Sequence, residues 1–199
     1  MGRPREISDR EILEQARVAF LEAGPTLSAA AIARKLGISE GTLFNRFSTK
    51  EQLLRRALGV PEPRWVELLV DDEPDLREHM VRVAENLLMF FQEAMPAMNL
   101  LRAAGLRPHQ SDVGTEEPPP KRLHRELSKW LERQQMRGRL ANRSPAVSAQ
   151  ALIGSLHTHA MMQHIWGQAM VELDDKRYVD TLIDTLFPEL LQGPEGPTK

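Results

Sequence analysis

Residues 32–54 read IARKLGISEGTLFNRFSTKEQLL, and this stretch decides the fold that we expect. Its first five residues suit the end of a short helix, and Gly37 can adopt the positive φ that a tight exit from a helix requires. Ser39 is a good N-cap for a second short helix over residues 40–47. Two short helices joined by a three-residue turn with a glycine form a helix-turn-helix pattern. By itself the pattern is weak, because many helical hairpins satisfy it.

Further helix-start signals lie before this stretch and within it. Ser8 and Glu11 form a capping box ahead of a predicted amphipathic helix over residues 12–23. Ser28 is a good N-cap for the first helix of the motif, and Thr49 for a further helix after it. The first 58 residues therefore predict four short helices.

The composition favours an all-α protein. Leu and Ala supply 46 of the 199 residues and Ile and Val supply 17, and only the second pair favours strands. The lack of cysteine excludes a disulfide framework, cysteine catalysis and thiolate zinc sites, and fits a reducing cytosol. The net charge of −2 excludes a uniformly basic nucleic-acid binder, but residues 1–56 carry +3 and the remainder −5. A small basic module is thus attached to a larger acidic one.

The residues quoted above resemble the DNA-binding segment of TetR-type transcriptional regulators. That pattern runs approximately I-A-x-x-A-G-V-S-x-G-T-L-Y-x-Y-F-x-S-K-E-x-L, and about 15 of its positions match or are conservative here. The resemblance covers about the first 58 residues. Two departures stand out: residues 24–27 are shorter than the usual connection and have no aromatic residue, and Phe44 and Arg46 occupy positions that are usually Tyr.

The resemblance implies that the helix over residues 40–47 enters the major groove of DNA, with Leu43 and Phe47 facing inward. Gly41 would permit close approach of the backbone, Asn45 would suit adenine, and Lys50 would suit a phosphate. The ordinary alternatives are local caps, solvated charges and a disordered N-terminal tail. The predicted DNA-binding residues are Arg3, Arg5, Ser28, Ser39, Glu40, Gly41, Thr42, Phe44, Asn45, Arg46, Thr49 and Lys50.

The rest of the chain shows no strand-like alternation and no repeat. We expect residues 1–58 to form the DNA-binding domain, residues 59–192 a helical ligand-binding and dimerisation domain, and residues 193–199 a disordered tail. Pro96 is expected to end or bend a strongly amphipathic helix. Residues 144–171 contain no Asp, Glu, Lys or Arg and are too polar for a membrane span. They predict a helix that is buried on one side by its own core and on the other by a second subunit.

Two further sets of residues follow from this reading and from the resemblance. The predicted dimer interface is Met162, Ile165, Trp166, Ala169, Tyr178, Leu182 and Leu186. The predicted pocket for a small, hydrophobic effector is Trp65, Leu87, Phe90, Phe91, Met95, Met98, Leu101, Leu127, Trp130, His157 and Met161, although ordinary core is the competing interpretation.

The predicted function is a cytoplasmic, DNA-binding regulator without enzymatic activity. We expect a repressor that binds a palindromic operator as a homodimer, responds to a small molecule, and needs no cofactor, metal or membrane. Two alternatives stay open: a small all-α metal-dependent hydrolase that uses His157, His159 and His164, and a helical protein-interaction module. The spacing of these histidines on one helix argues against a shared metal.

Overall fold

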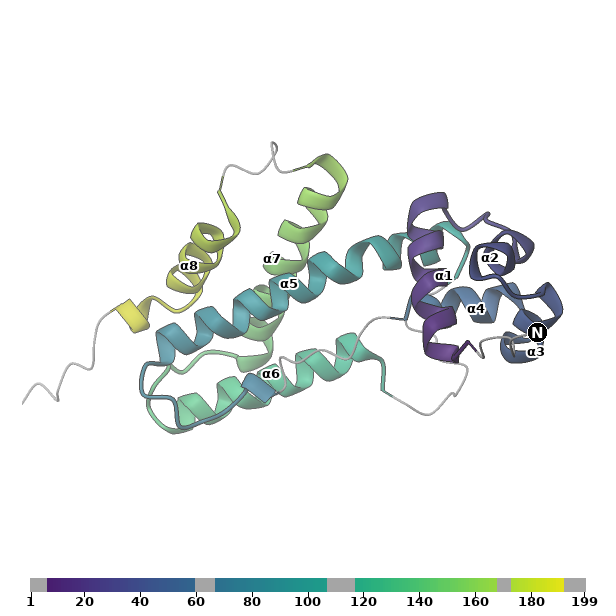
Figure 1. Cartoon of the computed structure of the whole chain (residues 1–199). Helices are drawn as coiled ribbons and strands as arrows, with labels where there is room; N and C mark the ends of the chain where they lie inside the picture. Colours follow the sequence, from purple (N-terminus) through teal and green to yellow (C-terminus); the bar gives the residue numbers. More distant parts are fainter. Residues whose placement is uncertain (1–6, 60–66, 107–116, 168–172, 192–199) are drawn as a thin grey trace, which may run out of the picture. The chain divides into compact units, whose positions relative to one another are not determined.

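The computed structural model describes residues 7–59, 67–106, 117–167 and 173–191, and all regular structure among them is helical (Figure 1). This confirms the all-α prediction. The chain divides into two compact units. The first contains the described residues up to 59 together with residues 96–106, and the second contains the remaining described residues.

The first unit begins with four short helices, each preceded by the predicted cap. The helices are α1 (Asp9–Ala23), α2 (Ala29–Leu36), α3 (Glu40–Phe47) and α4 (Lys50–Ala57). The hydroxyl oxygens of Ser8, Ser28, Ser39 and Thr49 each accept a hydrogen bond from the backbone N–H three residues later. These bonds satisfy N–H groups that have no partner inside their helix.

The core of the first unit draws side chains from all four helices and from the end of a fifth. Its largest fully buried members are Ile12, Phe20, Ile32, Leu43, Phe47, Leu53 and Leu58. Ala97 and Leu101 of the fifth helix join the same cluster. Of the two outcomes expected at Pro96, the helix end is wrong, because α5 (Leu76–Ala103) continues through that proline. Proline removes one helical hydrogen bond, and burial of the following apolar residues offsets that loss.

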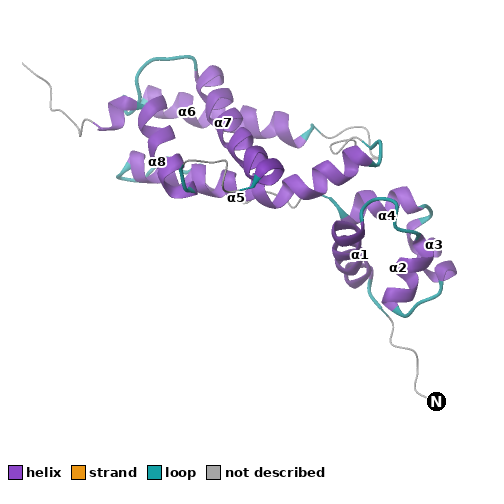
Figure 2. Ribbon diagram, turned by 90° about the horizontal axis from the view of Figure 1, so that it is seen from above, coloured by secondary structure: helices purple, strands orange, loops and turns teal. Residues whose placement is uncertain are grey.

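The second unit is built from the first part of α5 and three further helices. These are α6 (Pro119–Met136), α7 (Pro145–Trp166) and α8 (Asp175–Leu186), followed by the 3-10 helix η3 (Pro188–Leu191). Figure 2 shows α6, α7 and α8 beside that part of α5. Their shared core includes Met80, Leu87, Leu127, Trp130, Leu152, Leu156 and Ile183. None of the helices that the structure describes combines the length and apolar character needed to cross a membrane.

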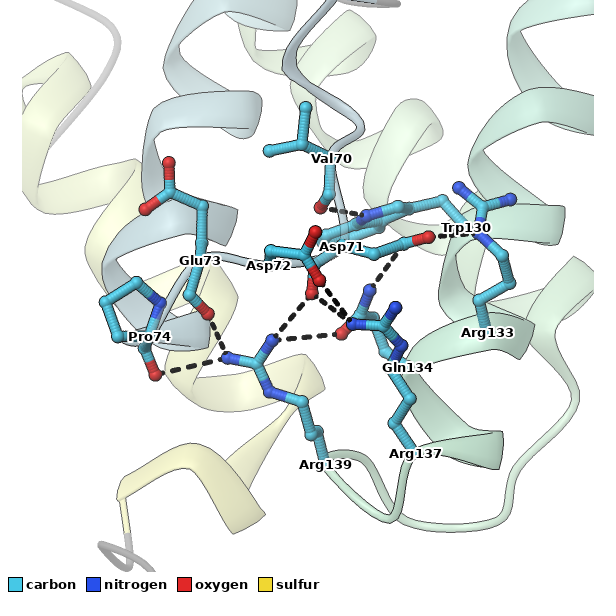
Figure 3. Close-up of polar contacts among 10 residues, drawn as sticks. All are labelled: Val70, Asp71, Asp72, Glu73, Pro74, Trp130, Arg133, Gln134, Arg137 and Arg139. Carbon is cyan, nitrogen blue, oxygen red and sulfur yellow. Dashed lines mark hydrogen bonds and ion pairs between the residues drawn. The ribbon is translucent and has the colours of Figure 1, made fainter.

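A cluster of polar contacts ties the segment before α5 to the end of α6 (Figure 3). We call it the Asp71 cluster, and it consists of residues 70–74 with Trp130, Arg133, Gln134, Arg137 and Arg139. The Asp71 carboxylate accepts hydrogen bonds from Arg133 Nε at 2.8 Å and from Gln134 Nε2 at 2.9 Å. The Trp130 indole N–H donates to the Val70 carbonyl at 2.9 Å. Since Trp130 and Gln134 are fully buried, the cluster anchors an irregular segment to the core.

Candidate DNA-binding surface

Helix α3 has one buried side and one exposed side. Leu43 and Phe47, four residues apart, are 1% and 0% exposed and hold α3 on the core. Glu40, Gly41, Phe44 and Asn45 are exposed, and Thr42 and Arg46 are half-buried at the margins of that side. The sequence-predicted face of α3 thus lies away from the core.

Two turns set the direction of α3. Gly37, which ends α2, has a φ of +68°, so the left-handed conformation favours glycine there. At the other end, Ser48 has a φ of +40° and leads directly to Thr49, the cap of α4. Lys50 is the first residue of α4 and is half-buried. Only Ser48 and Thr49 therefore separate the end of α3 from the start of α4.

The hydroxyl groups predicted to contact DNA already serve as helix caps. Ser39 Oγ accepts from the Thr42 N–H at 3.0 Å and lies 2.8 Å from Thr42 Oγ1. Ser28 Oγ accepts from the Ala31 N–H at 3.1 Å, and Thr49 Oγ1 from the Gln52 N–H at 3.0 Å. Ser28, Ser39 and Thr49 remain exposed, and a hydroxyl has capacity for a further hydrogen bond. Capping and phosphate contact are therefore compatible at these positions.

Arg46 lies differently from the expectation that its side chain faces DNA. Its Nη1 donates to the Ile7 carbonyl and to Asp9 Oδ1, the latter at 3.2 Å, and its side chain is 27% exposed. The other carboxylate oxygen of Asp9, Oδ2, lies 3.9 Å from Arg56 Nη2. Arg3 and Arg5 lie outside the described residues.

Sequence reasoning missed the contacts that Asp9 makes with Arg46 of α3 and with Arg56 of α4. Asp9 and Arg56 stand 37 residues before and 10 residues after Arg46 in the chain. No local pattern signals such a contact, because it depends on how α1, α3 and α4 pack. A basic residue at a position where the family pattern usually has Tyr was the one available indication.

The fold does not require glycine at position 41. A Cβ atom built on Gly41 would meet only Ser39 Oγ, at 3.8 Å, which is ordinary van der Waals contact. Gly41 also lies inside α3, where glycine is less favourable than alanine by roughly 0.5–1 kcal/mol. Its presence is therefore unexplained by the packing of the free chain.

The predicted effector pocket divides between the two units. Seven of its residues line or border the core of the second unit: Leu87, Phe90, Phe91, Met95, Leu127, Trp130 and Met161. His157 meets Phe91 edge to face, with ring centroids 5.4 Å apart. Leu101 instead packs in the core of the first unit, and Met98 is buried and belongs to that unit. Trp65 lies outside the described residues.

The three histidines of α7 do not meet at one point. His159 is 4% exposed, and its ring stacks on that of Tyr178 with the ring centroids 3.8 Å apart. Its Nε2 atom lies 3.1 Å from Asp175 Oδ1. His164 is exposed, whereas His157 packs on Phe91. Among the residues described, no three His, Cys, Asp or Glu side chains are placed to hold one metal ion. The metal-dependent hydrolase therefore gains no support from these side chains.

Asp175 instead organises a polar junction of α5, α7 and α8. Its carboxylate accepts from Gln92 Nε2 at 2.9 Å and from Gln163 Nε2 as well as contacting His159. Burial alone would raise the pKa of Asp175, but the hydrogen bonds from Gln92, Gln163 and His159 outweigh it and lower that pKa. The junction fixes the start of α8 against α7.

The predicted dimer residues differ in exposure. Ile165 and Trp166 are 53% and 55% exposed at the end of α7, and Met162 is half-buried. Tyr178, Leu182 and Leu186 border the core of the second unit while remaining partly exposed. The helix ends at Gly167, which has a φ of +78°, and Ala169 lies outside the described residues.

Comparison with known proteins assigns the helix-turn-helix. Residues 12–57 match the family model described as bacterial regulatory proteins, tetR family. Residues 12–57 therefore carry the domain that this family model describes. The matched residues include all of α2 and α3 and most of α1, so the TetR resemblance drawn from residues 32–54 is confirmed.

Three solved structures, the first of them a TetR-family transcriptional regulator, share the fold of about nine tenths of this chain. One, from Mesorhizobium loti MAFF303099, has a TM-score of 0.69 at 19% identity, over 89% of this chain and 94% of that one. FadR from Bacillus subtilis, in complex with stearoyl-CoA, has a TM-score of 0.62 at 15% identity, over 90% and 97%. AibR, in complex with isovaleryl coenzyme A and operator DNA, has a TM-score of 0.58 at 18% identity, over 90% and 97%. The predicted helical domain after the helix-turn-helix is thereby confirmed as a fold.

Proposed function

We propose that this chain is a transcriptional repressor that binds a palindromic operator as a homodimer and is released by a small hydrophobic effector. Helix α3 would enter the major groove with Gly41, Phe44 and Asn45 toward the base edges. The observation that carries the proposal concerns Gly41. The free protein has space for a Cβ atom at this position, whereas a helix backbone lying close against DNA would leave no space for one.

The exposed side chains of α3 suggest which base edges they meet. Asn45 can bond to adenine N6 and N7, and the exposed ring of Phe44 is suited to the methyl group of thymine. Lys50 and the caps Ser28 and Thr49 would contact phosphates, where helix N-termini favour negative charge. Arg3 and Arg5 would enter an adjacent minor groove. Specific contacts of this kind need two half-sites about 34 Å apart, or a multiple of that spacing, and hence a dimer.

An uncharged, exposed side of α7 supports the dimer. Val147, Gly154, Thr158 and Ile165 are exposed and lie on one side of the helix at spacings of seven, four and seven residues. Val147 is 65% exposed and Ile165 53%, which is unfavourable for apolar side chains in water. A second copy of α7 and α8 would cover them. The symmetric contact would pair the same surface on both subunits.

The effector is proposed to be an acyl thioester or a similarly apolar molecule. Phe91, Met95 and Met161 contribute aromatic and flexible thioether groups to the core of the second unit, and such groups adapt to apolar ligands. FadR and AibR were each solved with an acyl-CoA. We therefore expect an acyl chain to insert among the helices of the second unit and to change operator affinity.

Selection of duplexes from a random pool by the full-length protein tests the proposal. We expect a palindrome to be enriched, to bind more tightly than a random duplex, and to be released by acyl-CoAs of a preferred chain length. No preference for any duplex over random DNA would refute the proposed function. Enrichment of a site without two-fold symmetry would refute the palindromic dimer alone.

Substitution of two glycines separates DNA contact from folding. Gly41→Ala should preserve or slightly raise stability, by up to about 1 kcal/mol, yet weaken operator binding. Gly37→Ala is the matched control, because its φ of +68° strains any other residue and should cost about 1 kcal/mol of stability. Unchanged operator binding by the Gly41 variant would contradict the assigned surface.

A further inference from the structure

Helix α3 rests on the first unit through few side chains. It has eight residues, and only Leu43 and Phe47 among them are buried. These two lie four residues apart and therefore nearly above one another on the helix surface. Contacts along a single line resist rotation of a helix about its own axis less than contacts spread around the helix do. A third contact, off that line, helps to fix this roll.

Arg46 supplies a contact off that line. It precedes Phe47 by one residue, so it projects about 100° around the helix from the buried line. Its Nη1 donates to both the Ile7 carbonyl and Asp9 Oδ1, and these acceptors lie just before and inside the first turn of α1. Helix α3 is thus joined to the N-terminus of α1, next to Ile7, whose side chain packs at the border of the hydrophobic core.

Asp9 extends the contact to α4. Its other carboxylate oxygen lies 3.9 Å from Arg56 Nη2, in the last turn of α4. The Arg56 guanidinium in turn lies over the Phe47 ring, 4.9 Å from its centroid. One carboxylate therefore connects the first turn of α1 with arginines near the ends of α3 and α4, three helices visible together in Figure 1.

We propose that Arg46 is a positioning residue that fixes the roll of the recognition helix, rather than a contact to DNA phosphate. The inference rests on the proposed function, in which α3 reads base edges. A side-chain tip about 6 Å from the helix axis would move by ~1–2 Å for a roll of about 10–20°. That displacement is enough to break a hydrogen bond from Asn45 to a base.

The two roles of Arg46 predict opposite effects for its partner. If Arg46 bound phosphate, removal of the Asp9 carboxylate would release the guanidinium and remove a negative charge, so operator affinity would rise. If Arg46 positions α3, removal of Asp9 frees the helix to roll, and operator affinity falls. Asp9→Ala therefore discriminates by the sign of its effect.

The experiment measures operator affinity of the full-length protein over a salt series, with the enriched palindrome and a scrambled duplex. Arg46→Ala and Asp9→Ala should each weaken operator binding by about tenfold, the loss typical of a charge-assisted hydrogen bond, with little effect on the scrambled duplex. The double variant should bind little worse than Arg46→Ala alone, because the Arg46–Asp9 ion pair is already absent from that single variant. Arg46→Lys should rescue poorly, because one ammonium group lacks the planar fork of donors.

Salt dependence and three controls complete the design. Loss of a phosphate contact reduces the slope of log K against log salt by about 0.9, so the slope should fall for Lys50→Ala and stay unchanged for Arg46→Ala. Glu14→Ala removes an acidic group from the same helix, which pairs only with Arg10 in the contacts described, and should not weaken binding. Thermal unfolding should show every variant folded at the assay temperature.

The possible results are distinct. Higher affinity of the Asp9→Ala variant, or a shallower salt slope for Arg46→Ala, would overturn the positioning role while leaving the regulator intact. Lower thermal stability with unchanged operator affinity would also overturn it, because Arg46 would then serve folding alone. Failure of the unmodified protein to prefer any duplex would overturn the proposed function and this inference together.

Discussion

Replacement of Asp71 by alanine should destabilise the second unit by about 2–4 kcal/mol. The Asp71 side chain is 24% exposed and accepts from Arg133 and from the amide of Gln134, which is 0% exposed (Figure 3). Loss of an acceptor for a buried amide costs about 1–3 kcal/mol. Loss of the partly exposed bond from Arg133 adds about 1 kcal/mol. The hydrogen bonds that Arg137 and Arg139 donate to the Asp71 carbonyl survive the substitution.

The neighbouring residue provides a matched control. Asp72 carries the same charge, but its side chain is 95% exposed and pairs with Arg137 at 3.1 Å. Exposed ion pairs contribute about 0–1 kcal/mol, so Asp72→Ala should change stability by less than about 1 kcal/mol. Comparison of the two variants therefore separates the effect of burying a carboxylate on stability from the effect of its charge.

Urea unfolding followed by tryptophan fluorescence measures both variants. Trp130 reports on this region directly, since it is fully buried and its indole bonds to the carbonyl next to Asp71. Protein concentration must be the same in all experiments, because dimerisation would couple stability to concentration. Equal losses for the two variants, or a loss below about 1 kcal/mol for Asp71→Ala, would refute the reasoning.

Three further predictions concern pH, the dimer and base recognition. Burial lowers the pKa of His79, so the unfolded chain binds more protons than the folded one, and the free energy of unfolding should fall as pH drops below about 6.5. Urea titrations at a series of pH values should show a weaker pH dependence for His79→Leu. An unchanged pH dependence would exclude His79 as the cause. Ile165→Asp should shift the protein toward monomer in sedimentation, whereas a dimer that persists would exclude the α7 surface. Deoxyuridine in place of one operator thymine per half-site removes a methyl group from the DNA. It should weaken operator binding by about 0.8 kcal/mol for the unmodified protein but not for Phe44→Ala. Equal losses for both proteins would exclude Phe44 as the contact of that methyl group.

Local chemistry made the first unit predictable. The caps Ser8, Ser28, Ser39 and Thr49 each act on a backbone N–H three residues away, so their signal lies within one turn of helix. The buried positions of α3 follow from a spacing of four residues, and the turn at Gly37 follows from one residue type. Such features depend only on neighbouring residues and can therefore be predicted without knowledge of the tertiary packing.

Contacts between distant residues decided the rest. Pro96 predicts that a helix ends or bends there, yet α5 continues through it because Ala97 and Leu101 gain burial in a core that residues 12–58 form. The orientation of Arg46 depends on Ile7 and Asp9, and the satisfaction of Gln134 depends on Asp71, 63 residues away. A hydrogen bond of this kind forms only once folding has placed the two segments side by side.

The sequence by itself determined the helix-turn-helix, the all-α class and the uncharged character of α7, because each depends on residue types within a few positions of one another. Only the tertiary structure decided which side chains of α3 are exposed and which are held by contacts within the protein. Gly41, Phe44 and Asn45 are exposed, whereas Arg46, beside them in sequence, is bound to the first turn of α1. The physical reason is that a side chain's role depends on the partners within its reach, and chain folding supplies those partners from distant residues.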